Sequence, residues 1–114
     1  MKNNLTSITI KENIHYPASY YFCTGYIPTL AKRILQIIND YEKNSLYIKS
    51  IDMNNNTYNW LFRLFNYPCE QTINPLTVTP NGQFLFTVPI IITDELEDGM
   101  IIFNTGGDIE LDKN

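Results

Sequence analysis

Histidine, cysteine and tryptophan are scarce in this chain, whose 114 residues include one His, two Cys and one Trp. His15 is alone, and Cys23 and Cys69 lie 46 positions apart without a C-x-x-C pair, so the chain lacks the ligands for a four-coordinate zinc site. An unmodified cysteine behaves as a small apolar side chain. We therefore expect two buried thiols, with a disulfide or a reactive thiol as the alternatives, and we expect no metal and no cofactor.

Long apolar runs are missing as well, although 44% of the residues are hydrophobic. A membrane-spanning helix needs about 20 consecutive apolar residues, and no stretch approaches that length. The first residues contain one lysine but no apolar segment and no small-residue cleavage site, so no secretory signal is expected. We expect a single domain over residues 1–114 that is soluble and cytoplasmic and has no membrane partner.

Positive charge is nearly absent from the last third of the chain. Residues 69–114 contain eight acidic residues and one lysine, whereas residues 1–68 contain seven Lys or Arg and four acidic residues. The net charge of −4 therefore hides a division between a mildly basic and a strongly acidic part. Because the basic residues are scattered, we expect no nucleic-acid partner. An acidic surface attracts basic protein partners instead.

The clearest secondary-structure pattern lies in residues 76–103, which are rich in Val, Ile, Phe and Thr. Asn81-Gly82 is a dipeptide favoured in tight hairpin turns because both residues tolerate positive φ. Pro89 has no N–H to donate to a strand ladder, so it indicates an edge position or a bulge. We expect strands at residues 5–10, 46–51, 76–79, 84–92 and 100–103, with shorter ones possible at residues 20–23 and 109–111.

Apolar spacing predicts two helices. Pro28 fits the first helical position, and a single apolar stripe follows it, formed by Leu30, Ile34, Ile37, Ile38 and Tyr41. Asn44 tolerates the left-handed conformation that ends a helix. Thr57 is the predicted N-cap of a shorter helix that ends at Tyr67-Pro68. Together these elements predict an α+β fold: an antiparallel sheet of about five strands with two helices packed on one face.

The same periodicities predict the core and leave two aromatic residues outside it. The predicted core residues are Ile34, Ile38, Leu61, Phe65, Phe84, Phe86 and Ile102. Trp60 and Phe62 lie off the apolar stripe of the second helix, so they are either wedged between two layers or exposed as anchors for a partner. A tryptophan near an arginine is typical of binding hot spots. Tyr58, Trp60 and Arg63 are therefore candidate partner-binding residues.

No catalytic residue is predicted. His15 has no nucleophile placed beside it by a motif. The four carboxylates of Asp94, Glu95, Glu97 and Asp98 crowd into one turn instead of facing each other across a cleft, and they lack the ligand spacing of an EF-hand. We expect these four residues to form an exposed partner-binding patch, with a purely solubilising role as the alternative.

Residues 89–103 resemble the strand, acidic turn and strand found in some tailed-phage structural proteins. The resemblance covers 15 of the 114 residues. It implies a possible role in the assembly of a phage-like particle, and the uniformly apolar Ile90, Ile91 and Ile92 would then be the residues through which copies of the chain self-associate.

Three functional hypotheses follow in order of preference. The first is a noncatalytic protein-binding domain, an inhibitor or immunity-type protein that covers a basic partner with its acidic patch. The second is a small structural or assembly component of a phage-like particle. The third is an enzyme of unrecognised type.

Overall fold

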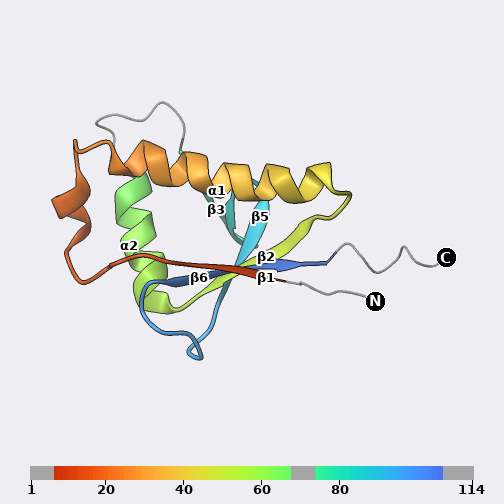
Figure 1. Ribbon diagram of the computed structural model, residues 1–114. Coiled ribbons are helices and arrows are strands. Elements are labelled where there is room, and N and C mark those ends of the chain that lie inside the picture. Colours follow the sequence, from red (N-terminus) through yellow and green to blue (C-terminus); the bar gives the residue numbers. More distant parts are fainter. Residues whose placement is uncertain (1–6, 68–73, 107–114) are drawn as a thin grey trace.

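The computed structural model describes residues 7–67 and 74–106. Its elements follow one another along the chain as coloured in Figure 1: β1 (Ser7–Lys11), the 3₁₀ helix η1 (Ala18–Tyr21), α1 (Tyr26–Lys43), β2 (Ile48–Met53), α2 (Asn55–Phe65), β3 (Leu76–Thr79), β4 (Gly82–Leu85), β5 (Val88–Ile92) and β6 (Met100–Thr105). The α+β class is therefore confirmed. Residues 20–23, a possible strand from sequence, lie instead in η1 and the turn after it, and residues 109–111 fall outside the described part.

The strands form one sheet in the order β1-β6-β2-β5-β4-β3. Over residues 7–67 and 74–106 the sheet has six strands where about five were expected. It is mixed, because β2 and β5 run parallel while the other neighbours are antiparallel. The extra strand arises at Phe86 and Thr87, whose positive φ values of 59° and 146° break residues 84–92 into β4 and β5. Pro89 follows this break, at the end of the β4–β5 pairing.

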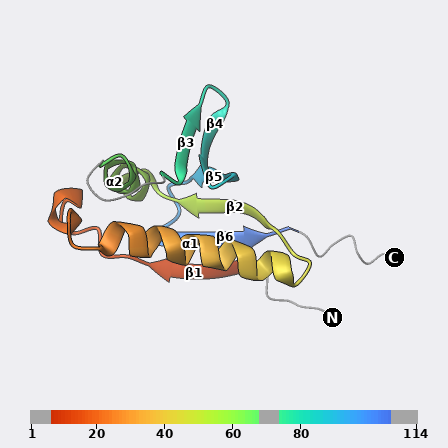
Figure 2. The same cartoon turned by 90° about the horizontal axis from the view of Figure 1, so that it is seen from above.

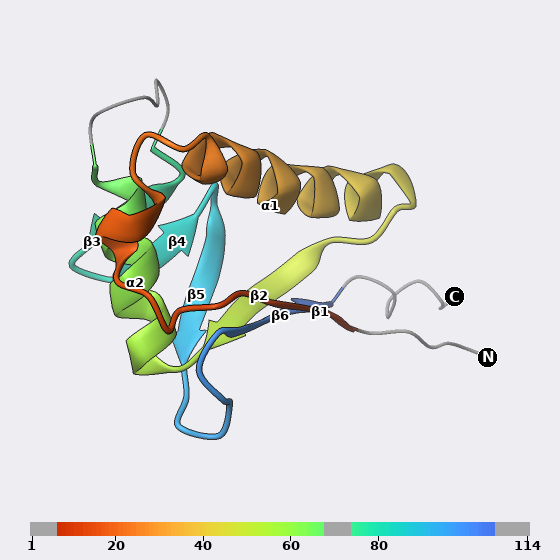
Figure 3. The same cartoon turned by 60° about the vertical axis from the view of Figure 1, so that its left-hand side comes forward.

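Both helices lie on one side of the sheet. Helix α1 runs along β1, β6 and β2, while β3 and β4 run across the direction of those strands, so that the sheet is strongly twisted (Figure 2). Helix α2 rises from the end of β2 toward the first turn of α1 (Figures 1 and 3). Within the described residues, no helix is both long enough and apolar enough to cross a membrane.

Helix α1 has the predicted apolar stripe except at Ile37, which is only partly buried, and its ends differ from the prediction. Its buried residues are Ile27, Leu30, Ile34, Ile38 and Tyr41. Gly25, with φ of 86°, is the N-cap, so Pro28 is the third helical residue and not the first. Proline is tolerated there because the N–H groups of the first turn have no acceptor within the helix. At the other end the left-handed residue is Ser45 and not Asn44, whose φ is −99°.

The N-cap of α2 is Asn54, three residues before the predicted Thr57. The Asn54 side-chain oxygen accepts a hydrogen bond of 2.8 Å from the Thr57 backbone N–H. Thr57 is instead fully buried, and its hydroxyl oxygen accepts a hydrogen bond from the backbone N–H of Gly99. Asparagine and threonine are both good capping residues, and here the cap is the asparagine that comes directly after β2.

The core prediction holds for the helices and fails for the strands. Ile34, Ile38, Leu61 and Phe65 are buried as predicted. Phe84, Phe86 and Ile102 are only partly buried, whereas the fully buried strand residues include Leu85, Ile101 and Phe103. Side chains alternate between faces along a strand, so an error of one residue selects the wrong face.

Cys23 is exposed, which contradicts the expectation of a buried thiol. It lies in the turn between η1 and α1 with φ of 61°, and its sulfur is 3.6 Å from the Tyr67 hydroxyl oxygen. Cys69 falls outside the described residues. The aromatic residues that surround Cys23 in the sequence therefore did not indicate that its side chain is buried.

Adjacent isoleucines in β6 provide a matched test of the sheet orientation. Ile101→Ala should lower the free energy of unfolding by about 2–5 kcal/mol, because Ile101 is fully buried. Ile102→Ala should cost about 1 kcal/mol or less, since Ile102 pairs with Thr9 and Asp52 on the opposite face. Urea denaturation of both variants measures the difference. Equal losses would contradict the assigned register.

Candidate functional site

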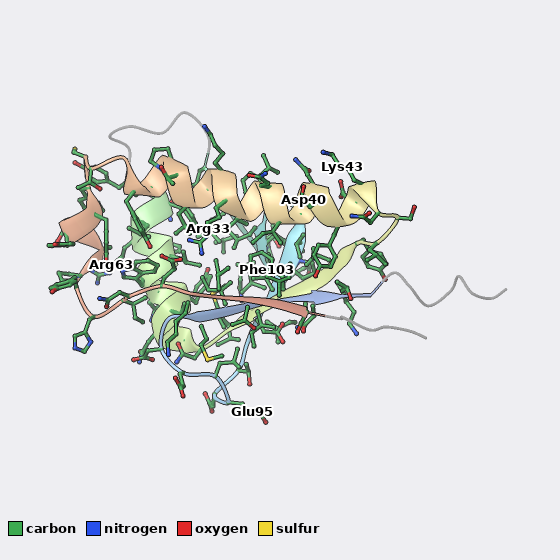
Figure 4. The ribbon with its side chains drawn as sticks, viewed as in Figure 1. Arg33, Asp40, Lys43, Arg63, Glu95 and Phe103 are labelled. Atoms are coloured by element: carbon green, nitrogen blue, oxygen red, sulfur yellow. The ribbon has the colours of Figure 1, made fainter. Side chains whose placement is uncertain are left out.

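The acidic loop, defined here as residues 93–99, joins β5 to β6 and projects beyond the ends of the strands (Figure 3). Asp94, Glu95, Glu97 and Asp98 are all exposed on it. Figure 4 shows Glu95 at the outer end of the loop. The four predicted carboxylates thus share one projecting loop, but their surroundings differ.

Asp98 is bound to the start of α2. Its Oδ1 accepts hydrogen bonds from the side-chain amides of Asn54, at 2.8 Å, and Asn56, at 3.2 Å. The Asn54 amide also donates to the backbone oxygen of Leu96. These two amides hold the pKa of Asp98 below its ordinary value, and the nearby His15 lowers the pKa further. The position at a helix N-terminus also favours a negative charge.

Glu97 and Gly99 connect the other side of the loop to β1. Glu97 forms an ion pair with Lys11 in which Nζ and Oε1 are 3.0 Å apart. The backbone oxygen of Gly99 accepts a hydrogen bond of 2.9 Å from the Glu12 N–H. Gly99 has φ of 87°, and a Cβ atom there would lie 2.1 Å from the Glu12 backbone oxygen. Only glycine combines this conformation with this close approach.

Two of the four carboxylates are not engaged by the described part of the protein. Asp94 and Glu95 make no hydrogen bond or ion pair through their side chains with any residue that the structure describes. Glu97 and Asp98 are instead engaged with Lys11 and the asparagines. The predicted patch is brought together as one loop, but it consists of two anchoring and two projecting acids.

Glu12 lies behind the loop as the centre of a polar cluster. Its side chain is 9% exposed and accepts a hydrogen bond of 2.9 Å from Arg33 of α1. The Tyr26 hydroxyl donates to the same carboxylate. Burial, followed by the hydrogen bond to Glu12 and its charge, raises the pKa of Tyr26. The hydrogen bonds of this cluster connect the end of β1 to α1, next to the Glu12 N–H that binds Gly99 at the base of the loop.

An open depression of about 350 Å³ adjoins this cluster. Its lining includes Lys11, Glu12, His15 and Asp98. Both carboxylates in the lining already accept hydrogen bonds from the protein. In the part of the chain that the structure describes, no group of three or more His, Cys, Asp or Glu side chains could hold a metal ion. The depression therefore supports no specific chemistry.

The three other predicted site residues separate into a buried and an exposed set. Trp60 is 6% exposed, and its ring lies edge-on to Tyr21 and Tyr26 at centroid distances of 5.7 and 6.1 Å. It is wedged between layers and offers no anchor. Tyr58 is partly buried, and burial raises its pKa. Arg63 is exposed at the end of α2 near η1 (Figure 4), next to Phe62, which is 42% exposed.

A second depression, of about 360 Å³, lies beside Arg63 and was not predicted. Its lining comes from η1 and the end of α2: Pro17, Ala18, Ser19, Phe22, Phe62, Arg63, Asn66 and Tyr67. The only sequence signal for it was the dense run of aromatic residues over positions 16–22, which has no regular period. The fold is needed to bring that run against α2.

The triple isoleucine segment is only partly covered. Ile90 is buried, Ile92 is partly buried and Ile91 is 48% exposed. Ile91 pairs with Asp52 of β2, whose other neighbour is Ile102. Self-association through these residues stays a hypothesis that the exposure of Ile91 allows.

Comparisons of the chain with models of protein families, with curated proteins and with solved structures found no match.

The anchoring of Asp98 predicts a pH effect. Because its pKa is lower folded than unfolded, the ionised carboxylate stabilises the fold at pH values above the unfolded pKa of about 3.9. That contribution should be lost as the pH falls through the lower, folded pKa. Asn56→Ala should raise the pKa of Asp98 toward its ordinary value, as measured by NMR titration of the carboxyl carbon. The neighbouring Asn55→Ala is the control and should leave it unchanged.

The close approach at Gly99 predicts a difference between two glycines with nearly the same φ. Gly25→Ala should cost about 1–2 kcal/mol of stability through its left-handed backbone alone, because no atom lies within 4 Å of the added Cβ. Gly99→Ala should lower the free energy of unfolding by about 1–3 kcal/mol more than Gly25→Ala does, because the added Cβ meets the Glu12 backbone oxygen. Thermal and urea unfolding measure both. Similar losses would show that the loop moves away from β1 without cost.

Proposed function

We propose that this protein is a noncatalytic protein-binding domain that uses the acidic loop to bind a basic partner, as an inhibitor or immunity-type protein does. The observation that carries the proposal is the state of Asp94 and Glu95. Both project from a loop whose other acidic residues are tied to α2 and β1, and neither carboxylate has a partner among the described residues.

Anchoring the loop supports tight binding. A loop that is already ordered loses less conformational entropy when it binds, so more of the interaction energy appears as affinity. Asn54, Thr57 and Glu12 each hold the loop through a separate hydrogen bond. The two projecting carboxylates can then meet cationic side chains of the partner in a defined geometry.

The charge of the loop supports rapid association. Complementary charges steer encounter over a Debye length of about 10 Å at 0.1 M salt. Glu97 and Asp98 remain exposed although they are anchored, so they contribute to the field around the loop. In this proposal Asp94 and Glu95 contact the partner directly, while the charges of all four acids accelerate its encounter with the loop.

A second candidate function, an assembly component that self-associates through Ile90, Ile91 and Ile92, is favoured by one observation. The exposed Ile91 is apolar and lies on the sheet face opposite the helices, since its neighbours Ile90 and Ile92 pack with the core. Light scattering of the purified chain separates the two candidates. A monomer would favour the binding domain. A defined oligomer that dissociates in the Ile91→Lys variant would favour the assembly component.

Removing the two projecting charges tests the main proposal. The tagged wild-type chain is used to capture partners from extract of its native host, and a captured basic protein is then purified. Asp94→Asn combined with Glu95→Gln should slow its association with the chain by about tenfold at low salt. The salt dependence of the association rate should also become weaker. Stopped-flow fluorescence measures both quantities.

A matched control removes two charges elsewhere. Asp40 and Glu42 are exposed on α1, and Figure 4 shows Asp40 away from Glu95 and its loop. Asp40→Asn combined with Glu42→Gln changes the net charge equally and should leave most of the association rate intact. If both double variants associate like the wild type, the acidic loop serves solubility alone.

A further inference from the structure

The second depression, between η1 and the end of α2, combines apolar walls with a single charge. Ala18 is buried at 3% exposure, and Phe22 stacks on Tyr67 with ring centroids 3.6 Å apart and planes 6° apart. Phe62 adds an exposed aromatic ring to the lining. Rigid aromatic side chains of this kind provide contact area at a low entropic cost.

Arg63 is the only charged residue among those described in the lining. It forms no ion pair and no hydrogen bond with any described residue. Its guanidinium group therefore keeps its full set of donors, which match the two oxygens of a carboxylate. The lining contributes no carboxylate that would compete for it.

Two stacked tyrosines extend the aromatic surface next to the depression. Tyr16 and Tyr20 have ring centroids 4.5 Å apart and are 47% and 59% exposed. They belong to the same segment as the lining residues of η1. Exposed aromatic residues clustered with an arginine are enriched at the energetic centres of protein interfaces.

We propose that this depression is a docking site for a segment of a partner protein that places an apolar side chain beside a carboxylate. The apolar side chain would lie against Phe22, Phe62 and Ala18, and the carboxylate would accept from Arg63. This site goes beyond the binding of a basic partner, because it lies on different elements from the acidic loop and selects the opposite charge.

Charge favours a peptide over a nucleic acid at this site. Stacked aromatic residues and an arginine also occur where proteins bind single-stranded nucleic acids, but such grooves track the phosphate backbone with several cations. Here the described lining has one cation, and the whole chain has a net charge of −4. A single carboxylate matches that arrangement, and a run of phosphates does not.

NMR chemical-shift mapping of the ¹⁵N-labelled full chain tests the site. The probe is a short capped peptide of glycine and serine that contains one phenylalanine followed by one glutamate. Saturable shifts are expected at η1 and at the end of α2. Replacing the peptide's glutamate by glutamine, or its phenylalanine by serine, should weaken binding by about tenfold.

Protein variants separate a docking role from general charge. Arg63→Gln should weaken binding of the peptide by about tenfold, whereas Lys43→Gln, which removes the cation in the last turn of α1, should not. Ser19→Glu places a carboxylate in the lining and should also weaken binding. Both substituted lining residues are exposed, and the spectrum of each variant reports its folding directly.

Four results of the peptide experiments would overturn the proposal. They are the absence of shifts at millimolar peptide, shifts confined to other surfaces, equal binding of the glutamate and glutamine peptides, and wild-type affinity in Arg63→Gln. Tighter binding of an oligothymidine to the same residues would also overturn it in favour of a nucleic-acid site. Binding of the peptide that depends on Arg63, Ser19 and both peptide side chains would support it.

Discussion

Gly99 lies close to Glu12 and also donates a hydrogen bond to the buried hydroxyl of Thr57. The position of the acidic loop depends on this pair of contacts. These contacts join the end of β1, the start of α2 and the start of β6, three segments that are far apart in sequence. Gly99 donates to Thr57 and accepts from Glu12, so both of its backbone groups are satisfied. A side chain at this position would force the segments apart, and the acidic loop would lose its orientation.

This junction explains why four carboxylates in one loop are not equivalent. Asp98 is drawn to the asparagines of α2 and Glu97 to Lys11 of β1, because the junction places the second half of the loop between these elements. The first half extends beyond them. Mutual repulsion among four close carboxylates would disfavour an ordered loop, and pairing two of them with the protein reduces that cost. The contacts of the junction thus determine which acids are engaged by α2 and β1 and which are not.

The sequence was informative where a regular period repeats and much less so where it does not. The stripe of α1 predicted the buried Ile34 and Ile38 because a helix repeats its pattern over several turns. In β6 the run Met100, Ile101, Ile102 and Phe103 is apolar at every position, so it could not identify the buried face. The acidic loop was visible as a composition change. Its anchoring was not, because Asn54 meets Asp98, and Thr57 meets Gly99, only through contacts between residues more than 40 positions apart.

The two candidate surfaces carry charges of opposite sign on separate parts of the domain. The acidic loop presents Asp94 and Glu95, and the depression beside η1 presents Arg63. None of these three side chains has a hydrogen bond or ion pair with a residue that the structure describes. The two surfaces lie on different elements, since η1 is packed on α2 while the loop is hydrogen-bonded to Asn54, the N-cap of the same helix. Helix α2 therefore sets the separation between the two surfaces, with Asn54 at one end and Arg63 at the other.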